Sequence, residues 1–379
     1  ALVRIMKLTS LLKRPVIQSA LISLGLFSAN TAQAADAIAD CVLREAPFSL
    51  QLPAYDVLTR PEARAIAEQY YPGLFETLPA WLLSEKMPSF ATILTLEQLI
   101  ARADPAKPRL AELDAELRAL PVTEAVKTAR CARFDAEPQY FSVDDAPVQV
   151  LVYQKINGYD HGRSVTAATE ALTRMSKEMG YGVTVTANGG AFNAKNLSQF
   201  DVVVWNNVSG DTLTLSQRAA FEDYMNNGGG FLGVHASGGD SIYFWDWYRD
   251  ALLGVQFIGH PMDPQFQLAE LTTHENSAHI AESLPDTWSI KDEWYSFAAE
   301  PDLEGVEYVI TIDEDSYAPG DLAMSGVHPI AWKHCVNEGR AMYTAIGHRE
   351  EMYDVPENIT LIKDALKWTS GHGAKVCAE

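Results

Sequence analysis

The sequence has little positive charge, few cysteines and no common nucleotide or thiol motif. Lys and Arg number 29 against 50 Asp and Glu, a formal net charge of −21 at pH 7. This balance argues against nucleic acid or anionic lipid as a partner, because a phosphate-rich surface needs a basic binding face. The four cysteines form no C-x-x-C pair, so zinc ribbons, thioredoxin-like redox sites and c-type haem are excluded. G-x-S-x-G and GxxxxGKS/T are also missing, which excludes elbow-type serine hydrolases and P-loop enzymes.

What is present is typical of a folded protein. Apolar residues make up 47% and charged residues 21% of the chain, values that are ordinary for a globular protein and unlike those of a disordered one. The 379 residues allow one large domain or two smaller ones.

Residues 1–34 differ from the rest of the chain. They carry four cations and no acid, an apolar run over residues 16–27, and the stretch Ala-Gln-Ala at 32–34. This order predicts a secretory signal peptide, whereas a membrane span needs about 20 apolar residues. Removing the four cations leaves 25 Lys and Arg against 50 acids, a charge of −25. We expect a periplasmic or secreted protein that is soluble and has no membrane contact after cleavage.

An exported protein with four cysteines is expected to form disulfides. Four cysteines allow three connectivities. We favour Cys41 with Cys131, which would join the ends of the N-terminal region. The second pair is then Cys335 with Cys377, which would attach the C-terminal tail (371–379) to a late strand.

Residues 35–145 are predicted to be mainly helical. Residues 95–103 have a capping-box start, with Thr95 and Gln98 three residues apart. Residues 108–120 place leucines on one side of a helix. Nothing here has the spacing of a metal, phosphate or nucleophile site, so we expect a packing or interaction module whose partner is unknown. The stretch Asp-Asp-Ala-Pro at 144–147 is expected to be a linker.

Residues 148–370 show a different pattern, in which apolar strands alternate with amphipathic helices. Such alternation predicts an α/β fold with a parallel sheet covered by helices on both faces. The three glycines at 228–230 precede a strand, so they suit a helix C-cap better than a dinucleotide loop. The expected strands are 148–153, 182–187, 201–206, 231–236, 306–312, 329–334 and 341–347, and the expected helices are 164–179, 215–227, 245–253 and 357–369.

Five histidines lie at predicted loop positions of this sheet. Ligands of such sheets bind beyond the carboxyl ends of the strands. Any one of these histidines could be a structural residue whose ring nitrogens have hydrogen-bond partners, but this explanation is less convincing for five of them together. Neutral imidazole is both a common metal ligand and a natural general base, and sequence does not choose between these roles. The five are His161, His235, His260, His328 and His348.

Acids and aromatic residues accompany these histidines. Asp292 and Glu293 stand beside two aromatics, and Glu351 follows His348 by three residues. A carboxylate can orient an imidazole, share a metal with it or exchange protons with it. An edge strand with exposed acids is the alternative for residues 292–295. The aromatic run at 243–248 suits either core packing or stacking against a sugar ring.

Several stretches together resemble the ThuA-like (trehalose utilisation) family, whose fold is that of the class I glutamine amidotransferases, a flavodoxin-like sheet. They are VLVYQKINGYDHGRS, FDVVVWNNVSGD, AAFEDYMNNGGGFLGVHASGG, WYRDALLGVQFIGHP, DEWYSF, HPIAWKH and YTAIGHREEMY, in order over about residues 148–370. The amidotransferases place a cysteine at the turn that holds His235 here, so the resemblance implies that thiolate amidotransfer is not available. Asp160 stands where the family often has arginine.

The resemblance implies an exported enzyme of sugar metabolism, acting on a disaccharide or a 3-keto-glycoside by histidine-centred and metal-assisted acid–base chemistry. A non-catalytic periplasmic carbohydrate- or metal-binding protein is the alternative. The expected ligand is a small carbohydrate, and the expected cofactor is a divalent metal or none. The candidate catalytic residues are His235, His348, Glu351, Glu293 and His161. The candidate substrate-binding residues are Tyr159, Trp245, Trp247, Tyr295 and Trp332, and the candidate metal ligands are His235, His260 and His328.

Overall fold

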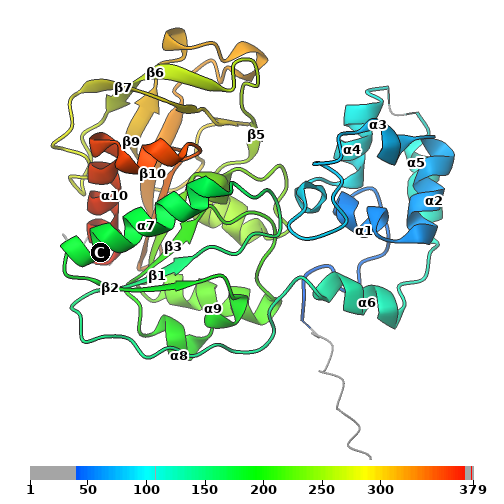
Figure 1. Cartoon of the computed structure of the whole chain (residues 1–379), viewed down its shortest axis with the longest axis horizontal. Coiled ribbons are helices and arrows are strands. Elements are labelled where there is room, and N and C mark those ends of the chain that lie inside the picture. Colours follow the sequence, from blue (N-terminus) through cyan, green and yellow to red (C-terminus); the bar gives the residue numbers. More distant parts are fainter. Residues whose placement is uncertain (1–39, 107, 372–376, 378–379) are drawn as a thin grey trace, which may run out of the picture. The chain divides into compact units, whose positions relative to one another are not determined.

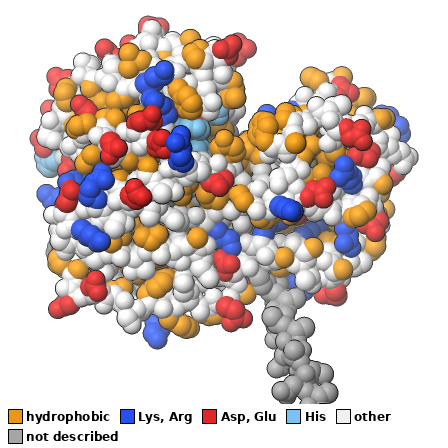
Figure 2. All heavy atoms as spheres, in the orientation of Figure 1, with side chains coloured by type: hydrophobic (Ala, Val, Ile, Leu, Met, Phe, Trp, Pro, Cys, Tyr) orange, Lys and Arg blue, Asp and Glu red, His pale blue; other side chains and the backbone are white. Residues whose placement is uncertain are grey.

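The computed structural model describes residues 40–106, 108–371 and 377 (Figure 1). The predicted signal peptide, residues 1–34, lies outside this part of the chain. In the part that is described, no helix has both the length and the apolar character that crossing a membrane requires. Acidic and basic side chains are interspersed on the face that Figure 2 shows.

The N-terminal region is helical, as predicted. Its helices share a hydrophobic core of their own, to which Leu99, Leu113 and Leu117 contribute fully buried side chains. The predicted capping box is confirmed: Gln98 N donates to Thr95 Oγ1 at 3.1 Å, and Thr95 N donates to Gln98 Oε1 at 2.9 Å. The elements are α1 (Ala54–Leu58), α2 (Pro61–Tyr70), α3 (Leu74–Thr77), η1 (Phe90–Ile93), α4 (Leu96–Ala103), α5 (Leu110–Arg118) and α6 (Glu124–Cys131).

The rest of the described chain is built on a nine-stranded sheet in the order β2-β1-β3-β4-β11-β10-β9-β6-β7. Continuous apolar runs such as Val202–Asn206 are buried on both faces, which is the pattern that predicted central strands. The strands are β1 (Gln149–Tyr153), β2 (Gly182–Thr186), β3 (Val202–Asn206), β4 (Gly230–Val234), β6 (Phe266–Thr273), β7 (Thr287–Glu293), β9 (Glu307–Ile312), β10 (Pro329–Val336) and β11 (Gly339–Thr344). A separate small sheet pairs β5 (Phe257–Gly259) with β8 (Ser296–Phe297).

The sheet is parallel only from β2 to β11, and this is a departure from the expectation of a parallel sheet. From β11 onward each neighbouring pair is antiparallel, in the order β11, β10, β9, β6 and β7. The two residues between β10 and β11 explain the change, because a parallel connection needs a crossover of about a dozen residues or more. Asn337 in this turn adopts φ 51°, a left-handed conformation that a tight hairpin turn requires.

Helices cover both faces of the parallel half. Helix α7 (Arg163–Glu178) contacts β1, β2 and β3, and α10 (Pro356–Thr369) contacts β4, β11 and α7. Helices α8 (Ala194–Leu197) and α9 (Leu215–Asn226) contact each other and lie on the opposite face (Figure 1). Gly228 follows α9 at φ 95°, so the predicted glycine C-cap is confirmed.

The structure departs from the sequence-based expectations at two further places and confirms the expected disulfides. The expected helix at 245–253 contains a π-helical stretch, Tyr248–Leu253, and Gly254 N bonds to Arg249 O five residues back. The strands β6 and β7 were not expected, although alternate residues of β7 are buried and exposed in the period of two that marks a strand. Both expected disulfides are confirmed, Cys41 with Cys131 and Cys335 with Cys377.

Candidate metal and active site

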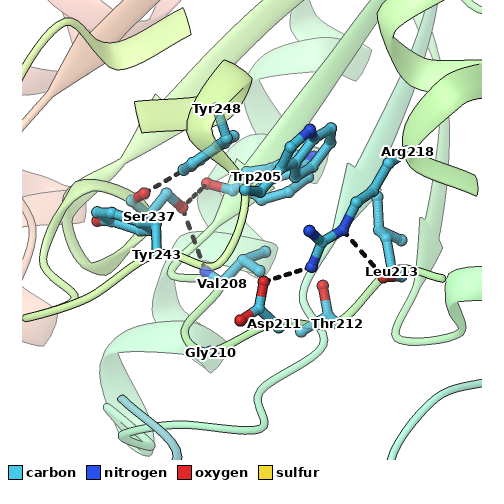
Figure 3. A pocket seen from close by; sticks show the side chains of 11 residues that line it. Trp205, Val208, Gly210, Asp211, Thr212, Leu213, Arg218, Ser237, Tyr243 and Tyr248 are labelled. Atoms are coloured by element: carbon cyan, nitrogen blue, oxygen red, sulfur yellow. Dashed lines mark hydrogen bonds and ion pairs between the residues drawn. The ribbon is translucent and has the colours of Figure 1, made fainter. Parts of the chain in front are cut away.

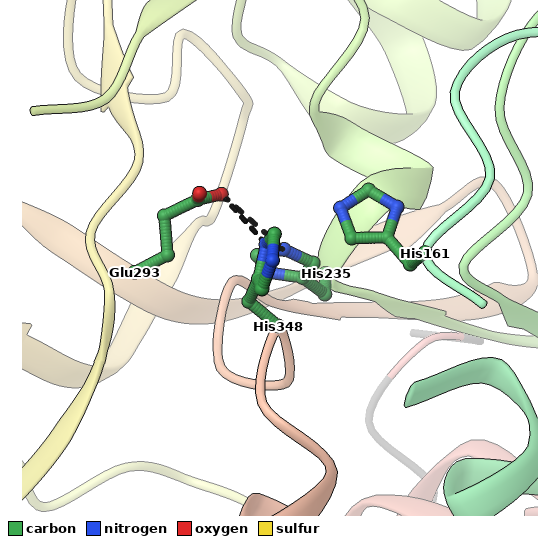
Figure 4. Close-up of side chains that lie close together, drawn as sticks. All are labelled: His161, His235, Glu293 and His348. Carbon is green, nitrogen blue, oxygen red and sulfur yellow. Dashed lines mark hydrogen bonds and ion pairs between the residues drawn. The ribbon is translucent and has the colours of Figure 1, made fainter. Parts of the chain in front are cut away.

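Four side chains that can bind a metal meet at one edge of the sheet (Figure 4). His161, His235 and His348 follow β1, β4 and β11, whose carboxyl ends lie at that edge because the strands are parallel. Glu293 is the last residue of β7. One ligand atom from each of the four side chains lies within 4.8 Å of all the others. We call these four residues the histidine–glutamate cluster.

His235 presents an unprotonated nitrogen to this cluster. Its Nδ1 lies 2.7 Å from the carbonyl oxygen of Ala345, and because a carbonyl only accepts, Nδ1 carries the proton. Burial, together with the charges of His161 and His348, lowers the pKa of His235 well below its ordinary value. The ring is therefore neutral, and its Nε2 lone pair lies 3.6 Å from Glu293 Oε1. A lone pair beside a carboxylate leaves a place suited to a cation.

Glu293 is the acid at the centre of the cluster. Burial alone would favour its protonated form, but the hydrogen bond from His348 and the charges of His260 and His348 hold its pKa below the ordinary value. Glu293 Oε1 lies 3.0 Å from His348 Nδ1, and Oε2 lies 3.3 Å from His260 Nδ1. Gln265 Nε2 also donates to Oε2. The carboxylate is thus ionised and held from two sides.

His161 completes the cluster with a nitrogen that has no protein partner. Its Nδ1 is buried and makes no hydrogen bond within the described residues. Burial, and secondarily the charge of His348, lower the pKa of His161 to about 3. A buried polar atom without a partner is costly, so this nitrogen suits a bound ligand or ion.

Asp292 holds the loop that carries His348. Its carboxylate accepts hydrogen bonds from the backbone N–H groups of Gly347 at 2.7 Å, His348 at 3.3 Å and Arg349 at 3.1 Å. Burial raises the pKa of Asp292 to about 6. Strand β7 is an edge strand of the sheet, as the alternative interpretation of residues 292–295 expected. Its two acids are not exposed, as that interpretation expected, but buried.

Three residues of the cluster line a pocket of about 680 Å³, and the fourth, His235, is fully buried beside them. Of the predicted residues, His161, His348, His260 and Glu293 line this pocket together with Tyr159 and Tyr295. The Tyr295 ring stacks on His235 with centroids 4.3 Å apart.

Other predicted site residues are placed elsewhere. His328 is buried, with Nδ1 2.9 Å from Glu314 Oε1 and Nε2 2.8 Å from the carbonyl oxygen of Tyr295, so it supports Tyr295 from behind. Trp332 is fully buried and donates to the carbonyl oxygen of Leu253. Glu351 is exposed and pairs with Arg349.

Trp245 and Trp247 stack on each other beside the core instead of lining the pocket. Trp245 donates from Nε1 to Glu222 at 2.7 Å. It also borders a separate cavity of about 20 Å³, the room of about one water, beside the ion pair of Arg218 and Asp211 (Figure 3). Core packing was the alternative for these aromatics, and the structure places them there.

Sequence reasoning missed several pocket residues. Asp240, five residues after His235, accepts hydrogen bonds from Ser209 Oγ and Gly210 N, and burial raises its pKa to about 7. A polar residue soon after the β4 turn was the available clue. The N-terminal region contributes Trp81, Phe90, Ile93 and Arg102, for which no spacing in the sequence gave a clue.

Comparisons with known proteins agree with this fold. The family model described as trehalose utilisation (ThuA) matches residues 149–369. A solved ThuA-like protein from Bacteroides uniformis shares 24% identity at a TM-score of 0.51, over 62% of this chain and 95% of that one. Another from Parabacteroides merdae shares 16% identity at a TM-score of 0.47, over 59% of this chain and 90% of that one. No curated protein matches the chain.

Proposed function

We propose that this chain, which belongs to the ThuA (trehalose utilisation) family, is an exported enzyme of sugar metabolism that uses a divalent metal. The substrate class is a disaccharide or a 3-keto-glycoside. The observation that carries the proposal is the histidine–glutamate cluster, whose ligand atoms lie within 4.8 Å of one another beside a pocket of about 680 Å³. Export rests on the pattern of residues 1–34, with a periplasmic or secreted destination.

The cluster has the chemistry of a metal site. Three imidazoles and one carboxylate suit zinc, iron, manganese or nickel. The depressed pKa values of His161 and His235 keep both rings neutral, the form that binds a metal. The bond from His235 Nδ1 to the Ala345 carbonyl is the outer contact that orients a metal-binding histidine. When bound, the metal would polarise a substrate carbonyl.

His260 is the acid–base group that the cluster leaves available. It lines the pocket, its side chain is 22% exposed, and its Nδ1 contacts the Glu293 carboxylate. A carboxylate partner orients an imidazole for proton exchange. His260 is thus placed to exchange a proton with a substrate in the pocket.

A 3-keto-glycoside fits these groups. The ketone acidifies the neighbouring C2–H bond, and His260 takes that proton while the bonding electrons form an enolate. Collapse of the enolate breaks the C1–O bond, and the electron pair leaves with the glycosidic oxygen. Asp240, whose pKa is raised to about 7 by burial, also lines the pocket and can supply the proton that this oxygen takes. The products are an alcohol and an unsaturated keto sugar, with no further reactant needed.

The first test measures metal content. Purified without a His-tag, the protein should contain about one divalent metal per chain by elemental analysis. His235→Ala should lose it, because the variant lacks one of four ligands. His279→Ala is the matched control, since His279 is 74% exposed and lies outside the pocket. Absence of stoichiometric metal, or full retention in His235→Ala, would contradict the metal site.

The second test measures turnover. The metal-loaded protein is incubated with trehalose, 3-keto-trehalose and methyl 3-keto-glucoside, and products are identified by mass spectrometry. We expect products that require metal, and their loss in His260→Ala with the metal retained. A ligand that binds and is recovered unchanged would instead favour the non-catalytic carbohydrate-binding alternative.

A further inference from the structure

Large apolar side chains are exposed at the outer part of the same pocket. Trp81 is 59% exposed, Ile258 is 51% exposed and Met262 is 67% exposed, and all three line the pocket. Trp81 belongs to the N-terminal region, whereas Ile258 and Met262 lie in and just after β5. Scattered exposed apolar residues are ordinary, but a group of them around one pocket marks a binding surface. We call Trp81, Phe90, Ile258 and Met262 the outer wall.

Aromatic rings connect the outer wall to the histidine–glutamate cluster. Trp81 meets Phe90 edge-on with ring centroids 5.3 Å apart, and Phe90 meets Tyr159 at 5.9 Å. Tyr159 in turn meets His161 at 4.8 Å. These rings therefore form a continuous series of aromatic contacts from the outer wall to the cluster.

The N-terminal part of this wall is held to the family domain by hydrogen bonds. Ser89 N donates to the carbonyl oxygen of Asn157 at 2.9 Å, and Thr92 Oγ1 donates to the same oxygen at 3.0 Å. Gln98 Nε2 donates to the carbonyl oxygen of Ser241 at 3.3 Å. These contacts lie within one unit of the chain. The wall is thus part of the pocket, although Trp81 and Phe90 lie outside residues 149–369.

We infer that the outer wall binds an apolar, ring-shaped aglycone attached to the sugar that the cluster holds. This inference rests on the proposed function, in which the sugar occupies the polar floor. Titratable and amide groups such as Glu293, His260 and Gln265 gather at the floor, whereas the wall offers indole, phenyl and aliphatic surface. A flat apolar ring buries such surface without leaving hydroxyl groups unpaired. The second sugar of a disaccharide would need polar partners, which the four side chains of the outer wall do not provide.

The test measures binding, so that it is independent of turnover. Calorimetry of the full-length, metal-loaded protein compares phenyl and methyl glucosides of the same anomer, for both anomers. We expect the phenyl glucoside to bind about tenfold more tightly, which corresponds to about 1.4 kcal/mol. Trp81→Ala should remove most of this preference and leave methyl glucoside binding little changed. Met262→Ser should also reduce the preference for the phenyl glucoside over the methyl glucoside.

Matched controls exist on the surface away from the pocket. Tyr140 is an aromatic residue with the same 59% exposure as Trp81, and Leu268 at 62% matches Met262. Tyr140→Ala and Leu268→Ser should keep the phenyl preference. Equal binding of phenyl and methyl glucosides, tighter binding of trehalose than of either, or a full preference in folded Trp81→Ala would each overturn the inference. A preference without any turnover would support the inference and count against the proposed enzyme.

Discussion

His235 adopts φ 44°, a left-handed conformation that few non-glycine residues take. Three contacts hold it there: Tyr343 Oη donates to its carbonyl oxygen at 2.7 Å, Ala345 O accepts from its Nδ1, and Tyr295 stacks on its ring. Backbone strain of this kind persists where the surroundings determine it strongly and is frequent at functional turns. At the residue scale, the protein is built to fix the direction of one imidazole nitrogen.

Asp240 allows a prediction about pH. Its pKa is raised to about 7 by burial, whereas an unfolded aspartate titrates near 3.9. Between these values the folded protein keeps a proton that the unfolded chain has lost, so the free energy of unfolding falls as pH rises from about 4 to about 7. Asp240→Asn should flatten this dependence, because the amide does not titrate.

Urea denaturation at several pH values checks this expectation. The quantity to compare is the difference in free energy of unfolding between the wild type and Asp240→Asn at each pH. Asp286→Asn serves as control, since Asp286 is exposed. A difference that stays constant from pH 4 to pH 8 would show that Asp240 does not titrate as described.

At the scale of elements, two capping boxes set the starts of α4 and α9. Thr95 with Gln98, and Thr214 with Gln217, each satisfy backbone groups that a helix start leaves without partners. Helix α4 matters for the site because it follows η1, which carries Phe90, and its Gln98 bonds to Ser241 O. The start of α4 thus lies between the N-terminal core and the pocket.

Thr95→Ala should therefore lower stability. Loss of an N-cap hydroxyl costs about 0.5–2 kcal/mol, and thermal unfolding should show a lower Tm. Thr360→Ala, at a half-buried position of α10 whose hydroxyl donates to the Pro356 carbonyl oxygen of the same helix, is the comparison variant and should change stability by no more than about 0.5 kcal/mol. The idea fails if the two variants are indistinguishable.

At the scale of the whole molecule, two disulfides close loops of unequal length. Cys41 and Cys131 are 90 residues apart and enclose the N-terminal helices, whereas Cys335 and Cys377 are 42 residues apart. The N-terminal helices and the part of the chain built on the nine-stranded sheet also have separate hydrophobic cores. The first disulfide therefore acts on the region that supplies Trp81 and Phe90 to the pocket.

Removing the first disulfide should destabilise the protein more than removing the second. In the chain-entropy model each bridge contributes about 2–5 kcal/mol, and the longer loop adds about 0.7 kcal/mol over the shorter one. Calorimetry of the double variants Cys41→Ser/Cys131→Ser and Cys335→Ser/Cys377→Ser measures this order. Equal or reversed losses of Tm would contradict the entropic account.

The sequence by itself determined the parts of the fold that depend on local pattern. Apolar runs predicted β1, β3 and β4, helical periodicity predicted α5, α7 and α10, and the Thr95–Gln98 spacing predicted a capping box that the structure contains. The sequence motifs also resembled the ThuA family, and the match of the family model over residues 149–369 shows that the chain belongs to it. Positions after predicted strands also pointed to His161, His235 and His348, because the carboxyl ends of parallel strands lie together. Glu293 was a candidate as an acid that accompanies these histidines in the sequence.

Only the tertiary structure decided which candidates lie together. His328 and His260 both precede proline in similar contexts, yet one supports Tyr295 from behind and the other faces the pocket. Trp332 and Tyr295 were equal candidates and both are buried, but only Tyr295 lines the pocket. The outer wall joins Trp81 to residues more than a hundred positions away, and no local pattern records such a contact. Spacing along the chain reports local periodicity, whereas a pocket is made by long-range packing.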